Sequence, residues 1–221
     1  GTRLRPITDS IPKCLVPLGG KPILELWLRK LEKIKCESVL INTHYLSTQV
    51  QEFIDRYQEN SKIHIDLSHE KEILGTGGSL MSNLDYFGDS LGIVIHADNF
   101  MYESLQPAIR QHQKCRPLMT MVTFTSSNPQ SCGIVEVDSQ GVVQSFYEKS
   151  ANPPGNMANG AIYIFDHRFV EYLRVNYEYK TQITDISSEI IPRLIGQIQV
   201  CHTDKMFADI GTLESYKTAQ E

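Results

Sequence analysis

The first 22 residues of the chain concentrate positive charge on a stiff segment. In GTRLRPITDSIPKCLVPLGGKP, Arg3 and Lys13 lie among four prolines, each of which fixes its φ angle and removes a backbone donor. A helical pattern follows at once, and a loop that leads into a helix favours phosphate through free N–H groups and the helix dipole. The segment therefore predicts a site for a compact anion. A solvated basic loop is the alternative interpretation on charge alone.

The net charge of −5 is unevenly distributed along the chain. Residues 1–35 carry eight Lys and Arg against three Asp and Glu, so the remainder is strongly acidic. A protein that binds nucleic acid needs a wide positive surface that releases many counterions. The charge pattern therefore argues against nucleic acid as a partner and favours a small anionic ligand.

Composition indicates one globular domain over residues 1–221. Hydrophobic residues make up 41% of the chain, and no stretch approaches the run of about 18 apolar residues that would span a bilayer. The five cysteines are scattered and form no CxxC pair, which argues against a disulfide framework or a zinc knuckle. We therefore expect a cytoplasmic protein without a membrane partner, and a homo-oligomer is compatible with the sequence. Cys14, next to Lys13, could have a lowered thiol pKa.

Hydrophobic spacing in the first half alternates between helix and strand. Helices are expected over 22–34, 47–58 and 77–87, and short apolar strands over 38–43, 62–68 and 91–97. Such alternation is typical of an α/β fold in which a mixed, mostly parallel central sheet has helices on both faces.

The second half predicts a small antiparallel extension of the same domain. Strands are expected over 117–125, 132–138, 142–149, 160–165 and 197–202, with the second and third joined as a hairpin through Ser-Gln-Gly. Helices are expected over 168–174 and 185–195 and close to the end of the chain, with Pro192 kinking or ending the second of them.

The opening segment resembles the signature GxGTRLxPxTxxxPKxLxPxxxKP of the sugar-1-phosphate nucleotidylyltransferases. Later segments are also similar to family motifs: ILGTGGSL to LGTAG, FYEKS to FxEKP, ANGAIYIF to NAGIYIF and FADIGTLESY to DIGTPESY. The resemblance covers nearly the whole chain and implies a Rossmann-like three-layer nucleotidyltransferase fold. In the family a strand with an LAGG turn precedes the signature, and we expect that segment to lie before residue 1. The compact length is similar to that of mannose- or heptose-1-phosphate guanylyltransferases and also to that of compact uridylyltransferases.

The resemblance implies transfer of a nucleoside monophosphate from an NTP to a sugar 1-phosphate, with release of pyrophosphate. Arg3 would hold the departing phosphates, and Lys13 would bridge the sugar phosphate and the α-phosphate. Asp98 and Asp209 would bind Mg²⁺. The implied nucleotide-binding residues are Gly1, Thr2, Glu70, Glu72, Gly75 and Thr76. The implied sugar-phosphate-binding residues are Gly133, Glu148, Lys149 and Asn159.

The choice of base rests on the HEKE segment before LGTGG. Glu70 or Glu72 could accept both N1–H and N2–H of guanine, a pair of donors that uracil and thymine lack. This favours GTP with a mannose-like or heptose 1-phosphate. A uridylyl- or thymidylyltransferase of the same family is the alternative. A glycosyltransferase and a non-catalytic regulatory paralogue that binds nucleotide sugars are more distant alternatives.

Overall fold

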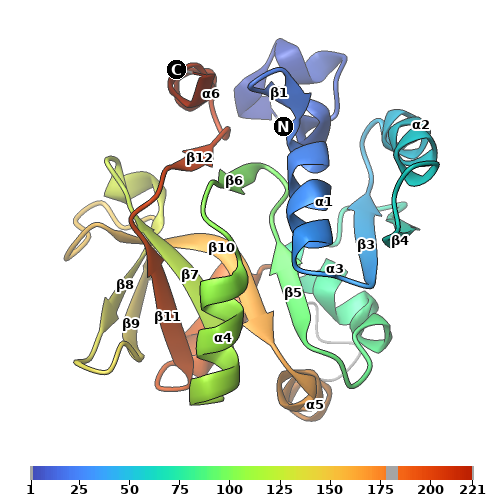
Figure 1. Cartoon of the computed structure of the whole chain (residues 1–221). Helices are drawn as coiled ribbons and strands as arrows, with labels where there is room; N and C mark the ends of the chain where they lie inside the picture. Colours follow the sequence, from blue (N-terminus) through green and yellow to red (C-terminus); the bar gives the residue numbers. More distant parts are fainter. Residues whose placement is uncertain (1, 178–183, 221) are drawn as a thin grey trace. The chain divides into compact units, whose positions relative to one another are not determined.

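The computed structural model describes residues 2–177 and 184–220 (Figure 1), which divide into two compact units. The first unit comprises Gly1–Ile73, His96–Leu105 and Met206–Glu221, and the second comprises Leu74–Ile95 and Gln106–Lys205. Each unit is therefore assembled from segments that are far apart in the sequence. Among the described residues, no helix is both long and apolar enough to cross a membrane.

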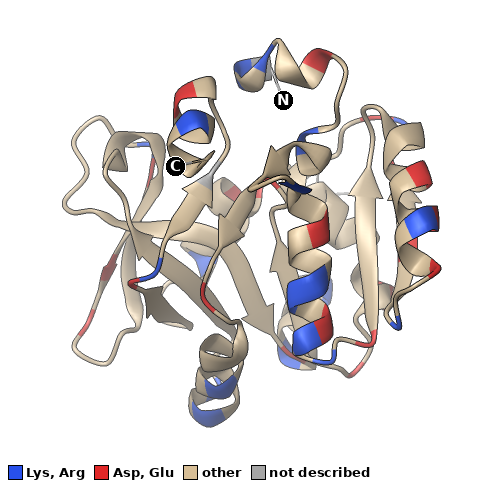
Figure 2. Ribbon diagram, turned by 45° about the horizontal axis from the view of Figure 1, so that its top comes forward, with Lys and Arg blue, Asp and Glu red and all other residues tan. Residues whose placement is uncertain are grey.

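The first unit begins with the proline-rich segment and the helix that follows it. The segment forms 3₁₀ turns over Thr2–Leu4, Ile7–Asp9 and Lys13–Leu15 and a tight antiparallel pair, β1 (Pro17–Leu18) and β2 (Lys21–Pro22). Helix α1 (Ile23–Lys33) then buries Leu24, Trp27, Leu28 and Leu31 at the helical spacing that predicted it. Acidic and basic positions alternate along its outer side (Figure 2), so the positive charge of this region is mixed with negative charge.

Two further strand pairs complete the first unit. Strands β3 (Ser38–Thr43) and β4 (His64–His69) are parallel, and α2 (Ser47–Gln58) connects them as the sequence predicts. Strands β6 (Asn99–Met101) and β12 (Phe207–Asp209) are antiparallel and join residues more than a hundred positions apart. A short helix, α6 (Leu213–Gln220), follows β12.

The second unit is built around a six-stranded sheet. Its order is β11 (Ile198–Thr203), β7 (Met119–Thr125), β10 (Met157–Phe165), β8 (Gly133–Val137) and β9 (Val143–Glu148), with β5 (Gly92–Ile95) also paired to β10. The β8–β9 hairpin is confirmed.

Helices cover both faces of this sheet. On one face, α3 (Gly75–Ser82), α5 (His167–Asn176) and the turns Ile186–Ile190 and Ile191–Leu194 pack an apolar core against the strands. Helix α4 (Gln106–Cys115) lies over β7, β10 and β11 (Figure 1), where the His112 ring is 2.9 Å from the Thr120 hydroxyl.

The expectation of a mostly parallel central sheet is wrong. In the described sheet, β10 pairs antiparallel with β5, β7 and β8, and β8 pairs antiparallel with β9. The described parallel pairs are β11 with β7 and β3 with β4. Periodicity identifies the strands but carries no information on their direction. The alternation of helix and strand therefore favours successive parallel strands even where the strands pair antiparallel. The strand over 91–97 instead pairs with a β10 that follows some sixty residues later in the chain.

Candidate active site

Lys13 and Asp98 meet in the first unit. Lys13 opens the third 3₁₀ turn directly after Pro12, and Asp98 lies in the turn before β6. The Lys13 Nζ lies 2.5 Å from the Asp98 Oδ2, and 20% and 40% of the two side chains are exposed. Burial alone would raise the pKa of Asp98, but the charge and hydrogen bond of Lys13 and the nearby His96 bring it below its usual range. The carboxylate is therefore ionised, and it is paired with the Lys13 ammonium.

The second predicted acidic ligand belongs to the adjacent strand. In the β6–β12 pair, Asp209 is in register with Asn99, the residue after Asp98. The backbone N–H of Ile210 donates to the carbonyl oxygen of Asp98 at 3.2 Å. The backbone of Asp209 alone is described, and it lies on the strand beside the turn that carries Asp98.

Trp27 supports this strand pair from α1. Its indole Nε1 donates to the Asn99 carbonyl oxygen at 2.6 Å, and its side chain is only 2% exposed. The indole also packs edge-on against the Phe100 ring, with the ring centroids 5.3 Å apart. In the sequence, Trp27 is one of the apolar residues of the helix expected over 22–34. The available signal was chemical, because a buried tryptophan needs an acceptor for its N–H.

The other predicted residues of the first unit differ in their burial. Arg3 is exposed on the first 3₁₀ turn. Gly1 lies outside the described residues, and for Thr2 only the backbone is described. Glu70 is 8% exposed directly after β4, where its Oε1 accepts a hydrogen bond from the Asn42 amide at 2.7 Å. Glu72 is exposed.

Gly75 and Thr76 begin α3 in the second unit. The Thr76 hydroxyl donates to the Asp185 Oδ2 at 3.0 Å and accepts from the Ile186 N–H at 3.0 Å. Gly75 has φ +76°, and a Cβ there would lie 2.0 Å from the Thr184 carbonyl oxygen. Sequence analysis missed Thr184 and Asp185. The sequence feature that could have identified this segment is Asp185, an aspartate directly before a predicted helix, where it caps the turn Ile186–Ile190.

The predicted sugar-site residues lie on β8, β9 and β10 of the second unit. Gly133 and Glu148 are direct partners in the β8–β9 pair, so the sheet places them side by side. The Lys149 ammonium is 3.1 Å from the Glu148 carboxylate.

Asn159 is engaged within its own strand. Its Nδ2 donates to the Tyr163 hydroxyl at 2.8 Å, and its Oδ1 accepts from the Ala161 N–H at 2.9 Å. Ala161 has φ +53°, within the stretch where the β10–β7 register shifts. The Asn159 side chain therefore stabilises an irregularity of β10, a role that the sequence analysis did not anticipate. Burial, opposed by hydrogen bonds from Asn159 and Ser187, raises the pKa of Tyr163 to about 12, so its hydroxyl stays protonated.

The comparisons with known proteins bear on both units. A family model described as Nucleotidyl transferase matches residues 1–221. The chain belongs to this family. The match confirms the family resemblance of the sequence motifs, and it spans the residues of both compact units.

Curated relatives within the nucleotidyl transferase family differ in their named substrates. The chain is 26% identical to a UTP–glucose-1-phosphate uridylyltransferase of Synechocystis sp., over 98% of this chain and 59% of the relative. It is 28% identical to a mannose-1-phosphate guanylyltransferase catalytic subunit beta of Xenopus tropicalis, over 99% of this chain and 60% of the relative. The chain thus spans about three fifths of the length of these relatives.

Solved structures share the nucleotidyl transferase fold. A putative glucose-1-phosphate thymidylyltransferase from Bacillus anthracis superimposes with a TM-score of 0.85 at 22% identity, covering 99% of this chain and 89% of that one. HddC from Yersinia pseudotuberculosis, complexed with GMP-PN, gives a TM-score of 0.77 at 24% identity, covering 100% and 93%. At these identities the likeness establishes the fold.

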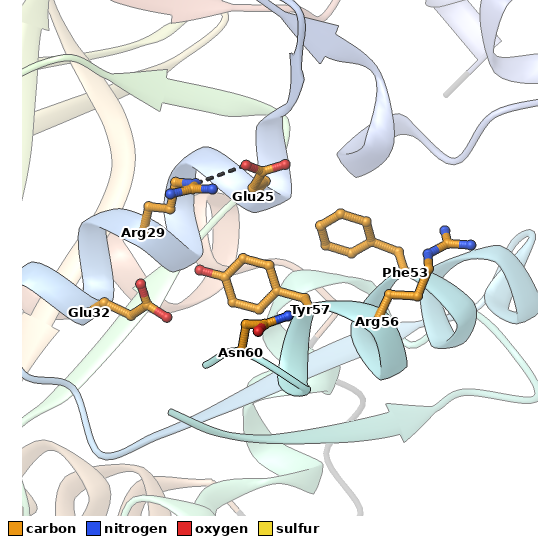
Figure 3. Close-up of a pocket in the computed structure, with 7 residues that line it drawn as sticks. All are labelled: Glu25, Arg29, Glu32, Phe53, Arg56, Tyr57 and Asn60. Atoms are coloured by element: carbon orange, nitrogen blue, oxygen red, sulfur yellow. Dashed lines mark hydrogen bonds and ion pairs between the residues drawn. The ribbon is translucent and has the colours of Figure 1, made fainter. Parts of the chain in front are cut away.

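A surface pocket of about 410 Å³ lies between α1 and α2 (Figure 3). It is lined by Glu25, Arg29, Glu32, Phe53, Arg56, Tyr57 and Asn60. Figure 3 shows the Tyr57 hydroxyl pointing between Arg29 and Glu32. The Arg29 Nε binds the Glu25 carboxylate at 2.8 Å, and the Ser61 hydroxyl donates to Glu32 at 2.7 Å. Because none of the residues implied by the family resemblance lines it, we do not assign the active site to this pocket.

Proposed function

We propose that the protein transfers a nucleoside monophosphate from an NTP to a sugar 1-phosphate. An oxygen of the sugar phosphate attacks the α-phosphorus, the bond from that phosphorus to the bridging oxygen breaks, and pyrophosphate leaves with its electron pair. The proposal rests on the family match together with one observation, the ion pair of Lys13 with Asp98 beside the β6–β12 strand pair.

The two substrates are both anions, so the main task of the enzyme is to neutralise and orient them. In the proposed reaction Lys13 bridges the sugar phosphate and the α-phosphate as a compact charge. Arg3, exposed on the first 3₁₀ turn, holds the departing phosphates through its planar donors.

The acidic residues of the first unit suit Mg²⁺. Asp98 is an ionised carboxylate that accepts a cation, and the strand register brings the backbone of Asp209 next to it. Among the described residues, no group of three or more His, Cys, Asp or Glu side chains could hold a metal ion. Mg²⁺ commonly keeps waters and takes phosphate oxygens in place of further protein ligands. Bound there, the ion would reduce the charge repulsion between the phosphates.

In the same proposal the residues of the second unit bind the remaining parts of the substrates. The turn at Gly75 and Thr76 binds the nucleotide, and the paired Gly133 and Glu148, with Lys149, bind the sugar phosphate. Asn159 contributes the hydrogen-bonding positions that Tyr163 and Ala161 leave available, since an amide offers two donors and two lone pairs.

The favoured substrates are GTP and a mannose-like or heptose 1-phosphate. Relatives named as mannose-1-phosphate guanylyltransferases match 99% of the chain, which supports this choice, and a relative named as a uridylyltransferase supports UTP as the alternative. Because Asn42 already binds one Glu70 oxygen, the exposed Glu72 is the better candidate for pairing with N1–H and N2–H of guanine.

The test is pyrophosphate release with Mg²⁺, assayed with GTP, UTP, dTTP, CTP and ATP separately against a pool of sugar 1-phosphates. We expect release with GTP, and a loss of preference for GTP in Glu72→Gln. Release with another nucleotide alone would overturn the assignment of the base but keep the reaction. Nucleotide binding without release in any combination would instead support a regulatory binder.

A further inference from the structure

The hydroxyl of Thr76 is committed to contacts within the protein. Its single proton is donated to the Asp185 Oδ2, and one of its lone pairs accepts the Ile186 N–H, both at 3.0 Å. A hydroxyl has one donor and two acceptor positions. Thr76 therefore has no proton left for a nucleotide, although it lies in the turn expected to bind one.

The backbone on either side of Thr76 is fixed against the same segment. The Gly77 N–H donates to the Thr184 carbonyl oxygen at 3.2 Å. That oxygen would lie 2.0 Å from a Cβ on Gly75, whose φ of +76° also disfavours any side chain. Residues 184–186 thus hold the start of α3 through three hydrogen bonds and a close backbone approach.

Residues 184–186 also make hydrogen bonds to residues outside α3. The Asp185 Oδ1 accepts from the backbone N–H and the hydroxyl of Ser188 at 2.9 and 3.1 Å. The Glu189 Oε1 accepts from the N–H and hydroxyl of Thr184 and from the N–H of Asp185, all within 3.0 Å. One carboxylate oxygen of Asp185 is therefore anchored while the other faces Thr76.

We infer that Asp185 is a positioning residue for nucleotide binding, and that it acts through the Thr76 hydroxyl. This inference rests on the proposed function, in which the turn at Gly75 and Thr76 binds the nucleotide. Asp185 fixes the rotamer of Thr76 and, through it, the direction of the backbone N–H groups at the start of α3. Neither the Asp185 carboxylate nor the Thr76 hydroxyl touches the nucleotide.

The test compares nucleotide affinity by calorimetric titration of GTP and UTP with Mg²⁺ into the whole chain. Asp185→Ala and Thr76→Val should each weaken binding of the preferred nucleotide about tenfold or more. Loss of a residue that orients a metal ligand has an effect of this size on metal affinity. Thr76→Ser, which keeps the hydroxyl, should bind like the wild type. The double variant should bind the nucleotide no more weakly than the poorer-binding single variant, because the Thr76–Asp185 hydrogen bond is the interaction that both changes remove.

Asp166→Ala is the matched control for stability. Asp166 caps α5 as Asp185 caps the turn Ile186–Ile190, and each accepts a backbone N–H near the start of its helix. Asp166→Ala should keep nucleotide affinity within about twofold. Hydrogen exchange at residues 75–82 should accelerate in Asp185→Ala and Thr76→Val but not in Asp166→Ala.

The possible outcomes separate the inference from the proposed function. A wild-type chain that releases no pyrophosphate with any nucleotide overturns the proposed function. An active wild type together with an unchanged affinity in Asp185→Ala overturns only the role of Asp185. Additive losses of affinity in the double variant would mean that Thr76 and Asp185 act independently, and they would overturn the inference as well. If Asp185→Ala does not fold, Thr76→Val and Thr76→Ser test the same hydrogen bond from its other side.

Discussion

The ammonium of Lys13 lies 2.5 Å from a carboxylate oxygen of Asp98, across 85 positions of sequence. A proline fixes the backbone before the lysine, and the Trp27 indole fixes the strand that follows the aspartate. In the proposed reaction this contact joins the residue that binds phosphate to one that binds the metal.

We expect Lys13→Met to lower turnover by about a hundredfold to a thousandfold, because it removes a charge that the transition state needs. Pyrophosphate release measures the loss, and circular dichroism should show an intact fold. Lys33→Met removes the same charge from the exposed end of α1 and should keep turnover within about twofold. Equal turnover in the two variants would contradict the role of Lys13.

Much of the fold could be predicted because apolar spacing is a local property. The pattern of Leu24, Trp27, Leu28 and Leu31 predicted α1, and Ser-Gln-Gly predicted the β8–β9 hairpin. The direction of the strands could not be predicted, because pairing with the central β10 depends on residues far along the chain. The helix expected over 185–195 is instead a π turn followed by a 3₁₀ turn that contains Pro192.

The site could be predicted only where residue types repeat a family motif. The family resemblance implied Lys13 and Asp98, and the structure brings them into contact. Trp27 and Asp185 belong to no motif quoted in the sequence analysis, because they act through other residues. Their roles follow only from their hydrogen bonds in the structure. The Trp27 indole donates to the Asn99 carbonyl oxygen, and the Asp185 carboxylate accepts from the Thr76 hydroxyl.

Trp27→Phe tests the support of β6 from α1. The change removes the indole donor to the part-buried Asn99 carbonyl, and loss of such a hydrogen bond costs about 0.5–1.5 kcal/mol. We expect a lower melting temperature and a several-fold higher Mg²⁺ concentration for half-maximal turnover, with the KM for the sugar phosphate unchanged. Phe53→Leu on α2 is the control, because it removes aromatic packing away from β6. A Mg²⁺ requirement that rises equally in both variants would refute the link to the metal site.

Asp166 predicts a pH dependence of stability. Burial alone would raise its pKa, but the hydrogen bonds and charge of Arg168 lower it below the usual value. A lowered folded-state pKa stabilises the protein above the unfolded value of about 3.9, and this contribution disappears as pH falls through the folded-state pKa. Asp166→Ala should therefore lower the free energy of unfolding by about 1–2 kcal/mol at neutral pH. Urea titrations should show this difference shrinking as pH falls below the unfolded value of about 3.9, and a constant difference would contradict the argument.

Cys14 should react slowly with alkylating agents, contrary to the lowered pKa expected from its position next to Lys13. Burial, only partly opposed by a backbone hydrogen bond, raises the pKa of its thiol to about 11. At pH 7.5 about one thiol in three thousand is then the reactive thiolate. Peptide mass spectrometry after a brief N-ethylmaleimide pulse should find Cys115, which is exposed, labelled well before Cys14. Labelling of Cys14 as fast as Cys115 would mean that the thiol is not buried.

Gly133→Ala tests the sugar end of the proposed site. A Cβ at Gly133 would lie 2.5 Å from the Phe146 ring and 2.8 Å from the Glu148 Oε2, so both side chains must move. Because Glu148 is proposed to accept sugar hydroxyls, we expect the KM for the sugar phosphate to rise about tenfold while nucleotide affinity stays within about twofold.

Gly155→Ala is the matched control for Gly133→Ala. A Cβ at Gly155 would meet no described atom within 4 Å. Gly155→Ala should therefore leave the KM for the sugar phosphate and the nucleotide affinity unchanged. An equal KM in the two variants would exclude Gly133 and Glu148 from the sugar site. A rise in KM for the nucleotide alone would instead place the β8–β9 pair against the base or ribose, because the displaced Glu148 carboxylate would then affect the other substrate.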